Sequence, residues 1–243
     1  MPIQSLQGAL RIALLVAVFF VGVWSQSSGV IEEFFFYLPD IQFLAVQHLW
    51  LTATSGGLAI LVAIPLGVVL SRPSMARVAE SAMQVLNVGT TIPTLAVLAL
   101  SMSFLGIGTV PAVFGLFVAT LLPITRNTYA GLKGVSPALM EAAAGIGMSP
   151  TQRLLRVELP NALYVIFAGI RTALTLNVGT VPLAFLIGAG GLGELIFTGI
   201  DLYDPVMMLS GALPTALLAI VVDAIVATIA FLVVPRGVNP TRA

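Results

Sequence analysis

Long apolar runs separated by short polar segments make up most of this chain. A helix needs about 20 mainly apolar residues to cross the hydrocarbon core of a membrane. Runs of this kind lie near residues 9–25, 48–70, 79–101, 108–126, 162–187 and 206–234. The pattern predicts an all-α integral membrane protein with about six transmembrane helices.

Six prolines fall within or beside these runs. A proline inside a helix removes one backbone hydrogen bond, and its ring clashes with the preceding turn. In a membrane the freed groups must be satisfied by neighbouring helices or by water in a cavity, and transporters use such breaks to build sites. We expect breaks at Pro65, Pro93, Pro111, Pro123, Pro182 and Pro214.

The first run allows two interpretations. Arg11, the apolar stretch to Trp24 and the polar residues 25–28 resemble a signal peptide. No small-x-small cleavage pattern follows, which favours an uncleaved helix. Residues 26–47 include an aromatic run at 34–37 and are expected along the outer membrane interface, where aromatic side chains gather. The expected units are therefore 1–47, a membrane core at 48–234, and a tail at 235–243.

The composition agrees with a membrane protein and excludes other classes. Of 243 residues, 58% are apolar and 8% are charged, whereas a soluble domain carries about a quarter charged residues. The absence of cysteine rules out disulfides and thiolate metal sites, and a net charge of zero argues against nucleic-acid binding. The one histidine, His48, is too few for a histidine metal site. It is predicted to be an interface anchor, with proton transfer as the less favoured alternative. No metal or cofactor is expected.

The few charges are sorted between two sides. Lys and Arg near the ends of spans mark the cytoplasm. One side carries Arg72, Arg77, Arg126, Lys133, Arg153, Arg156, Arg236 and Arg242. The opposite loops carry Glu32, Glu33, Asp40, Glu194, Asp201 and Asp204. This distribution predicts that both termini are cytoplasmic.

Residues 129–161 form the longest charged connection between spans. Ser136-Pro137 is a helix start signal and predicts a helix from 137 to about 144. Ser149, with Gln152 three residues later, predicts a capping box and a second helix that ends before Pro160. Two capped helices favour a docking surface for a protein partner over an ordinary loop on lipid headgroups.

This loop also holds a spaced set of residues: Glu141, Ala142, Ala143, Gly147, Val157, Leu159 and Pro160. The set resembles the signature of permease subunits of binding-protein-dependent ABC importers, Glu-Ala-Ala, three residues, Gly, nine residues, an aliphatic, one residue and Leu-Pro. The resemblance implies the type I importer-permease fold and coupling helices that seat in a groove of a cytoplasmic ABC ATPase. Glu141 and Gly147 would form the core of that seat.

Further stretches between about 47 and 230 resemble the osmoprotectant branch of this family, among them Thr91-Ile92-Pro93-Thr94 and Ala168-Gly169-Ile170-Arg171-Thr172-Ala173. That branch imports glycine betaine, choline and carnitine. The resemblance implies an extracytoplasmic solute-binding protein, two ATPases, and a second permease copy or sister permease as partners. In one departure, Val181-Pro182-Leu183-Ala184-Phe185 replaces the small-residue stretch expected there, which leaves the exact solute open.

The sequence gives no support for a nucleotide-binding site. The chain contains no Gly-x-x-x-x-Gly-Lys-Ser/Thr sequence, and Lys133 is its only lysine, so it is not expected to bind ATP or to be an enzyme. Hydrolysis would reside in a partner chain. Gly188-x-Gly190-x-x-Gly193 matches a dinucleotide fingerprint but follows a membrane span instead of a strand, which favours a turn on the outer side.

Polar residues at membrane depth are the candidates for lining a transport pathway. They are Thr90, Thr91, Pro93, Thr94, Asn177, Thr180 and Asp223. Asn177 and Asp223 could equally well form hydrogen bonds between helices instead of lining a pathway. Pro93 could equally well produce a structural kink.

Three other functions remain alternatives. The chain could be an ABC permease for a different small, amino-acid-like solute. An ion-coupled secondary transporter would show internal repeats and several membrane acids, and the spans hold one deep acid and no clear repeat. An intramembrane enzyme would need a nucleophile with a base, or metal ligands, within the spans.

Overall fold

The computed structural model describes residues 16, 22, 26 and 29–238 of the chain, and all regular structure within them is helical. Its long elements are α3 (Leu38–Leu70), α6 (Thr109–Lys133), α9 (Leu159–Thr180) and α11 (Pro205–Val233). The shorter ones are α2 (Val30–Phe36), α4 (Ala76–Gly89), α5 (Thr94–Leu105), α7 (Pro137–Gly145), α8 (Pro150–Arg153) and α10 (Gly193–Asp201). The predicted first span near 9–25 falls almost entirely outside the described residues.

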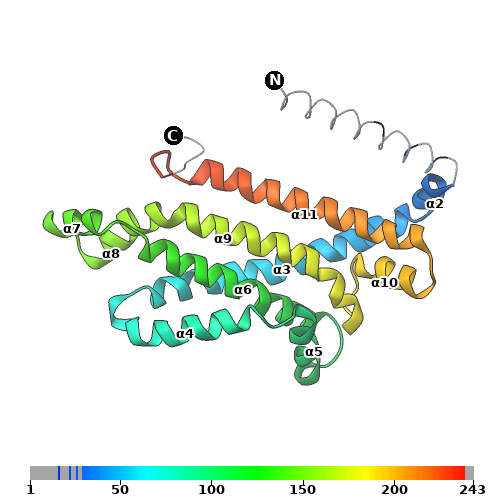
Figure 1. Ribbon diagram of the computed structural model, residues 1–243, viewed down its shortest axis with the longest axis horizontal. Helices are drawn as coiled ribbons and strands as arrows, with labels where there is room; N and C mark the ends of the chain where they lie inside the picture. Colours follow the sequence, from blue (N-terminus) through cyan, green and yellow to red (C-terminus); the bar gives the residue numbers. More distant parts are fainter. Residues whose placement is uncertain (1–15, 17–21, 23–25, 27–28, 239–243) are drawn as a thin grey trace, which may run out of the picture.

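The long helices run lengthwise beside one another, with α7 and α8 at one end and α2 and α10 at the other (Figure 1). Within the described residues, four helical segments are long and apolar enough to cross a membrane: 38–70, 109–133, 150–187 and 205–233. These confirm the predicted spans at 48–70, 108–126, 162–187 and 206–234; the first three helical segments are longer than predicted, and the last is shifted by one residue.

Small residues let α3, α6 and α9 approach closely. A Cβ on Gly67 of α3 would lie 2.6 Å from the Thr128 side chain on α6, and one on Gly169 of α9 would lie 2.4 Å from Asn127. Ala59, Ala63 and Ile124 are fully buried in the cluster between these helices. Close backbone approach is the usual packing mode of membrane helices, because lipid is as apolar as their side chains.

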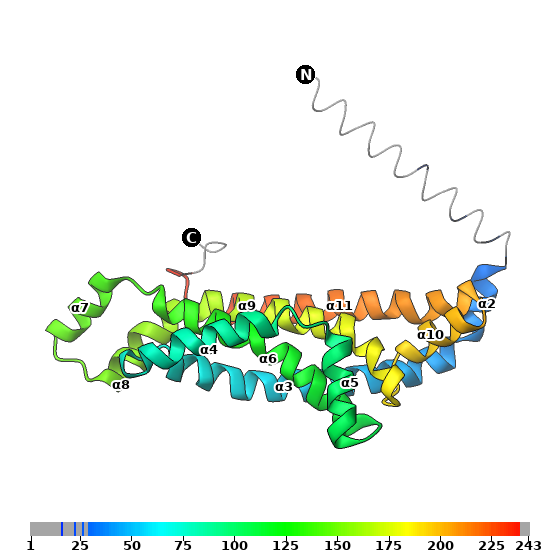
Figure 2. The same cartoon turned by 60° about the horizontal axis from the view of Figure 1, so that its bottom comes forward.

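The predicted third span, 79–101, is not one straight helix. It divides into α4 and α5, which are bent by 101° relative to each other. α5 runs at a steep angle to the long helices (Figure 2) and packs on α6 through the buried Leu98. Pro93 is the N-cap of α5 and has ψ of 133°, outside the helical range. Proline also disfavours the helical conformation at the residue before it, so the chain turns here.

The breaks predicted at four of the other prolines are absent: Pro65, Pro123 and Pro214 lie inside continuous helices, and Pro111 lies in the first turn of α6. At Pro182 the α-helix does end: α9 stops at Thr180, and a 3₁₀ segment, Val181–Ile187, follows. The carbonyl that a proline inside a helix leaves unbonded is the one four residues before it. Membrane helices tolerate this where neighbouring groups or water satisfy that carbonyl.

Candidate functional site

The end of the molecule formed by α7 and α8 has the two helices that the sequence predicts. α7 starts after Ser136 and ends in a Schellman motif, in which Gly147 has φ of +80° and the Met148 amide donates to the Ala143 carbonyl at 3.1 Å. Ser149 and Gln152 form the predicted capping box at the start of α8. Local sequence signals therefore fix the shape of this end.

This end projects beyond the helix bundle (Figures 1 and 2). It exposes apolar side chains together with an acid. Glu141 and Ala142 are exposed, Ala143 is buried, and Ile146 has 75% of its surface exposed. Exposed apolar residues grouped on a projecting surface mark a place where another protein or a membrane docks.

The expectation that the second helix ends before Pro160 is wrong. α8 continues through a π-helical turn, Leu154–Glu158, directly into α9, so that residues 150–187 form one helical segment. Pro160 lies in the first turn of α9. The proline lacks the N–H group that an α-helix would use at this position. In the π turn each carbonyl accepts from the amide five residues later instead of four, so the helix can continue past Pro160.

An ion pair fastens this turn to the bundle. Glu158 is 7% exposed, and both its oxygens accept hydrogen bonds from the Arg72 guanidinium, one of them at 3.1 Å. Arg72 also donates to the Val68 carbonyl at the end of α3. From the sequence, Arg72 is predicted only to be a cytoplasmic charge, and Glu158 carries no signal that marks it as its partner. The two residues are 86 positions apart, and no local pattern links them.

Most of the predicted pathway residues border one cavity. It has a volume of about 390 Å³ between α4, α5, α6 and α9, and Thr90, Thr94, Asn177 and Thr180 are among its lining residues. Thr91 and Pro93 do not line it but form the bend beside it. Asp223 does not line it either, because α11 lies on the other side of α9.

Asn177 connects three helices at this cavity. Its amide nitrogen donates to the hydroxyl oxygens of Ser55 on α3 and Thr120 on α6, the first at 3.0 Å. Asn177 is 3% exposed. The hydroxyls of Ser55 and Thr120 in turn donate to carbonyls of their own helices, each at 2.7 Å. Neither hydroxyl residue is predicted from the sequence, and both give Asn177 the role of a bridge between helices.

A second cavity, of about 690 Å³, lies between α9 and α11. Asp223 borders it and accepts hydrogen bonds from Arg171, and the Thr175 hydroxyl lies 3.5 Å from the same carboxylate. Leu176 lines both cavities. The two spaces therefore adjoin each other along α9.

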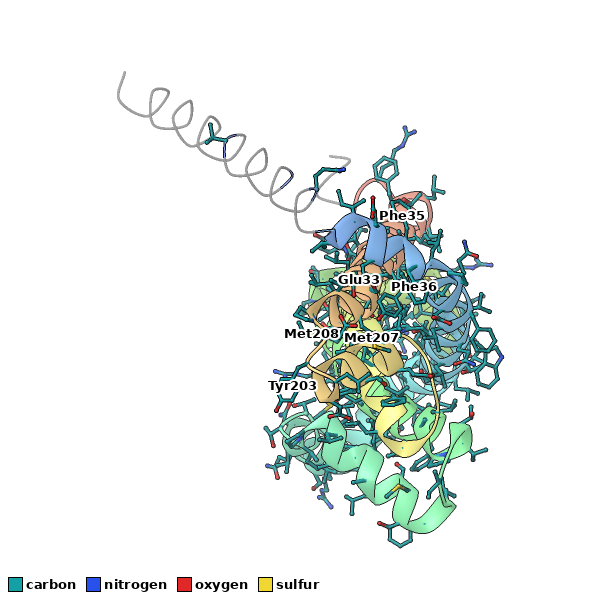
Figure 3. All side chains as sticks on the ribbon, turned by 90° about the vertical axis from the view of Figure 1, so that its right-hand side faces the viewer. Glu33, Phe35, Phe36, Tyr203, Met207 and Met208 are labelled. Atoms are coloured by element: carbon teal, nitrogen blue, oxygen red, sulfur yellow. The ribbon has the colours of Figure 1, made fainter. Side chains whose placement is uncertain are left out.

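The opposite end of the molecule is formed by α2, α10 and the start of α11. The Tyr37 hydroxyl donates to Asp204 at 2.8 Å, and this bond, with burial, raises the pKa of Tyr37 to about 12. Backbone N–H groups of Met207 and Val206, together with Tyr37, hold the pKa of Asp204 below its usual value. Phe35, Phe36 and Tyr203 are exposed here (Figure 3).

His48 and the glycine turn lie near this end. His48 is fully buried, with Nε2 3.0 Å from the Val178 carbonyl, so the prediction of an interface anchor is wrong: the ring is enclosed between α3 and α9. The turn at 188–193 follows a 3₁₀ helix, with positive φ at Gly188 and Gly190. The Gly191 amide donates to Gln47. This agrees with a turn and not with a dinucleotide site, which requires a preceding strand.

Comparison with known proteins gives a consistent result. The family described as binding-protein-dependent transport system inner membrane component matches residues 63–236. The chain is 51% identical over 216 residues to the osmoprotectant import permease protein OsmY of Salmonella typhimurium, covering 89% of each chain. It is 42% identical over 200 residues to the choline transport system permease protein OpuBB of Bacillus subtilis, covering 82% of this chain and 91% of that one.

A further relative is the glycine betaine/carnitine/choline transport system permease protein OpuCB of Bacillus subtilis, 43% identical over 193 residues, or 79% of this chain and 88% of that one. Among solved structures, an inward-facing MetNI methionine ABC transporter matches with a TM-score of 0.73 and 23% identity, over 82% of this chain and 98% of that chain. At this identity the match establishes the fold alone.

Proposed function

The chain belongs to the family of binding-protein-dependent transport system inner membrane components, and from this premise we propose that it is the permease subunit of an ATP-driven importer of osmoprotectants such as glycine betaine, choline or carnitine. As a transporter component it is not itself catalytic. The observation that carries the solute class is the 51% identity over 216 residues to an osmoprotectant import permease, supported by choline and betaine permeases above 40%.

The α7–α8 end is the proposed seat for a cytoplasmic ABC ATPase. Glu141, Ala142, Ala143 and Gly147 lie on or directly after α7, and the Schellman motif gives their surface a fixed shape. Leu159 and Pro160 begin α9, to which the seat is joined without a break. Movement imposed on α8 would therefore reach the membrane helices directly.

The cavity beside Asn177 is the proposed site of part of the transport pathway. Thr90, Thr94 and Thr180 supply hydroxyl groups to its wall, while Thr91 and Pro93 form the bend that shapes it. Asn177 contributes mainly as the bridge between α3, α6 and α9. The remaining candidate, Asp223, belongs to the neighbouring cavity.

We propose two further partners, because importers of this family depend on a solute-binding protein and a paired permease. An extracytoplasmic solute-binding protein would deliver solute to the α2–α10 end, and a second permease copy or sister permease would complete the pathway within the lipid bilayer. In the inner membrane, both termini would lie in the cytoplasm and the acidic loops outside, an orientation that the charge distribution supports. A permease for an amino-acid-like solute is the second candidate, because residues 181–185 depart from the osmoprotectant pattern.

Uptake of labelled glycine betaine tests this proposal. The chain would be expressed with its neighbouring ATPase and solute-binding protein in cells that lack their own osmoprotectant systems. We expect uptake by the wild type and none by Glu141→Arg, because a reversed charge in the seat blocks ATPase docking. Glu80→Arg, the same reversal at an exposed acid on α4, is the matched control and should transport normally.

Two results would contradict the proposal. Normal uptake by a correctly inserted Glu141→Arg variant would mean that α7 is not the ATPase seat. An assembled wild-type complex that imports none of glycine betaine, choline and carnitine would exclude the solute class but not the family.

A further inference from the structure

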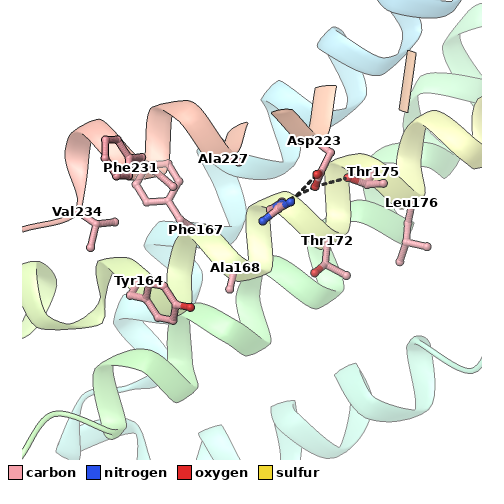
Figure 4. Close-up of a pocket in the computed structure, with 12 residues that line it drawn as sticks. Tyr164, Phe167, Ala168, Thr172, Thr175, Leu176, Asp223, Ala227, Phe231 and Val234 are labelled. Atoms are coloured by element: carbon pink, nitrogen blue, oxygen red, sulfur yellow. Dashed lines mark hydrogen bonds and ion pairs between the residues drawn. The ribbon is translucent and has the colours of Figure 1, made fainter. Parts of the chain in front are cut away.

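The cavity between α9 and α11 has an aromatic end and a polar end. Tyr164, Phe167 and Phe231 are grouped toward one end, and Asp223, Thr172 and Thr175 lie toward the other (Figure 4). With a volume of about 690 Å³, the cavity falls within the range of small-molecule sites in proteins, roughly 300–1,000 Å³.

The ion pair at the polar end leaves one edge of the guanidinium unused. Asp223 accepts hydrogen bonds from Nε and Nη2 of Arg171. Among the described residues no group accepts a bond from Nη1. A guanidinium binds carboxylates through paired N–H groups, so the edge formed by Nη1 and the second N–H of Nη2 can hold a further carboxylate without displacing Asp223.

The exposure of this pair is unusual for charges at membrane depth. Half of the Arg171 side chain and 31% of the Asp223 side chain are exposed. Placing either charge in lipid is costly, about 2.5–3.5 kcal/mol on insertion scales. Membrane charges of this kind normally face a bundle interior or a water-filled path, and the cavity between α9 and α11 is the open space that this pair borders.

The cavity also adjoins the proposed pathway. Leu176 borders both spaces, and the exposed face of α9 continues from it through Thr172 and Ala168 to Tyr164, at the helical spacing of four residues. A solute that leaves the cavity beside Asn177 can therefore move along this face of α9.

We propose that this cavity is a binding site for a small zwitterionic solute that has a carboxylate and a quaternary ammonium group. The free edge of Arg171 binds the carboxylate. The aromatic faces of Tyr164 and Phe167 attract the ammonium, as aromatic side chains do in choline-binding sites. Asp223 is a positioning residue that holds the guanidinium in place and offsets its charge. The assignment rests on the proposed osmoprotectant transport.

Uptake of two solutes by the same complex tests the assignment, since choline carries the quaternary ammonium but no carboxylate. We expect Arg171→Gln to lower glycine betaine uptake by about tenfold or more, the usual effect of losing a charge-assisted contact. Choline uptake should stay within about twofold of wild type. The solute-binding protein is the same in every variant, so its own preference does not enter the comparison.

The exchanged pair Arg171→Asp with Asp223→Arg is the second variant. It can restore an attraction between α9 and α11 but moves the guanidinium to the other helix. We expect glycine betaine uptake to remain low in the exchanged pair. Equal loss of both solutes in Arg171→Gln with recovery in the exchanged pair would overturn the site and make the ion pair structural.

Normal glycine betaine uptake by Arg171→Gln would also overturn the site. Wild-type complexes that import neither solute would instead overturn the proposed solute class. This result needs no variant, so it is distinguishable from failure of the proposed site. If the wild type imports glycine betaine but not choline, the exchanged pair decides: recovery overturns the site and continued loss supports it.

Discussion

Two polar contacts lie on α9 within six residues of each other, and they are built in different ways. Asn177 is neutral, 3% exposed and bonded to hydroxyls of two other helices. Arg171 is charged, half exposed and paired with one acid beside a cavity. A saturated, enclosed polar group holds helices together, whereas a charged group that keeps donors free on an open cavity is suited to bind a ligand.

The strongest test of this comparison is removal of the enclosed contact. Asn177→Leu should lower the free energy of unfolding by about 2–3 kcal/mol, because it deletes hydrogen bonds worth about 1 kcal/mol each and places a branched side chain between three helices. Thermal unfolding in detergent, followed by tryptophan fluorescence, measures the change. Thr180→Val is the control: Thr180 lines the same cavity, but its hydroxyl bonds only to a carbonyl of its own helix. This variant should melt near the wild-type temperature.

A melting temperature unchanged in Asn177→Leu, with uptake abolished, would reverse the assignment. Asn177 would then act on the solute and the distinction between the two contacts would fail.

The charged contact should respond in the opposite way. Asp223→Asn keeps a hydrogen-bond acceptor for Arg171 but removes the charge that holds it. We expect glycine betaine uptake to fall by roughly threefold to tenfold, equivalent to about 0.6–1.4 kcal/mol. The melting temperature should change little, because half-exposed ion pairs contribute little to stability. A large loss of stability with normal uptake per folded complex would assign this pair a structural role.

A smaller change sharpens the role of the enclosed contact. Thr120→Val preserves shape but removes one acceptor of Asn177, which keeps its bond to Ser55. We expect a loss of stability of about 0.6–1 kcal/mol, the range measured for single hydrogen bonds between membrane helices, with no change in the ratio of glycine betaine to choline uptake. An altered ratio would show that the hydroxyl contacts solute.

The smallest effect is expected outside the spans. The pKa of Asp204 is lowered in the folded protein, so its contribution to stability is present above the ordinary carboxyl pKa and is lost as the pH falls through the lowered value. Asp204→Asn keeps an N-cap for α11 and should lack this step in melting temperatures measured from pH 6 to 3. A step that persists in the variant would have to come from another carboxyl.

The same pair gives an alkaline test. The pKa of Tyr37 is raised to about 12, so its contribution is present below pH 10 and is lost as the pH rises toward 12. Tyr37→Phe should remove this loss.

Short-range signals in the sequence were sufficient for the α7–α8 end. Signals at fixed spacings predict caps that depend on neighbouring backbone alone, and the structure has the Ser149 capping box and the turn at Gly147. Ser136 is the N-cap residue of α7, but its side chain makes no capping hydrogen bond. The prediction that the second helix ends before Pro160 was wrong, because the effect of this proline depends on the π turn before it. That turn has no sequence signature of its own.

Contacts across the bundle could not be predicted. Asn177 and Asp223 look alike in the sequence, as single polar residues at membrane depth. Ser55 lies 122 positions from Asn177, and Arg171 lies 52 positions from Asp223. Only the packing of α3, α6, α9 and α11 decides that one group is enclosed and the other open. The enclosure of His48 depends on the same packing.

The π turn at Leu154–Glu158 also sets an angle. Each residue of an α-helix rotates the chain by about 100°, and a π turn takes up one residue more than an α turn would. Deleting one residue here and letting the turn become α-helical would leave α8 and α9 each intact, yet turn one against the other by about a quarter of a revolution. The orientation of the α7–α8 surface relative to the membrane helices is therefore encoded in the number of residues in this turn, separately from the residues that the surface displays.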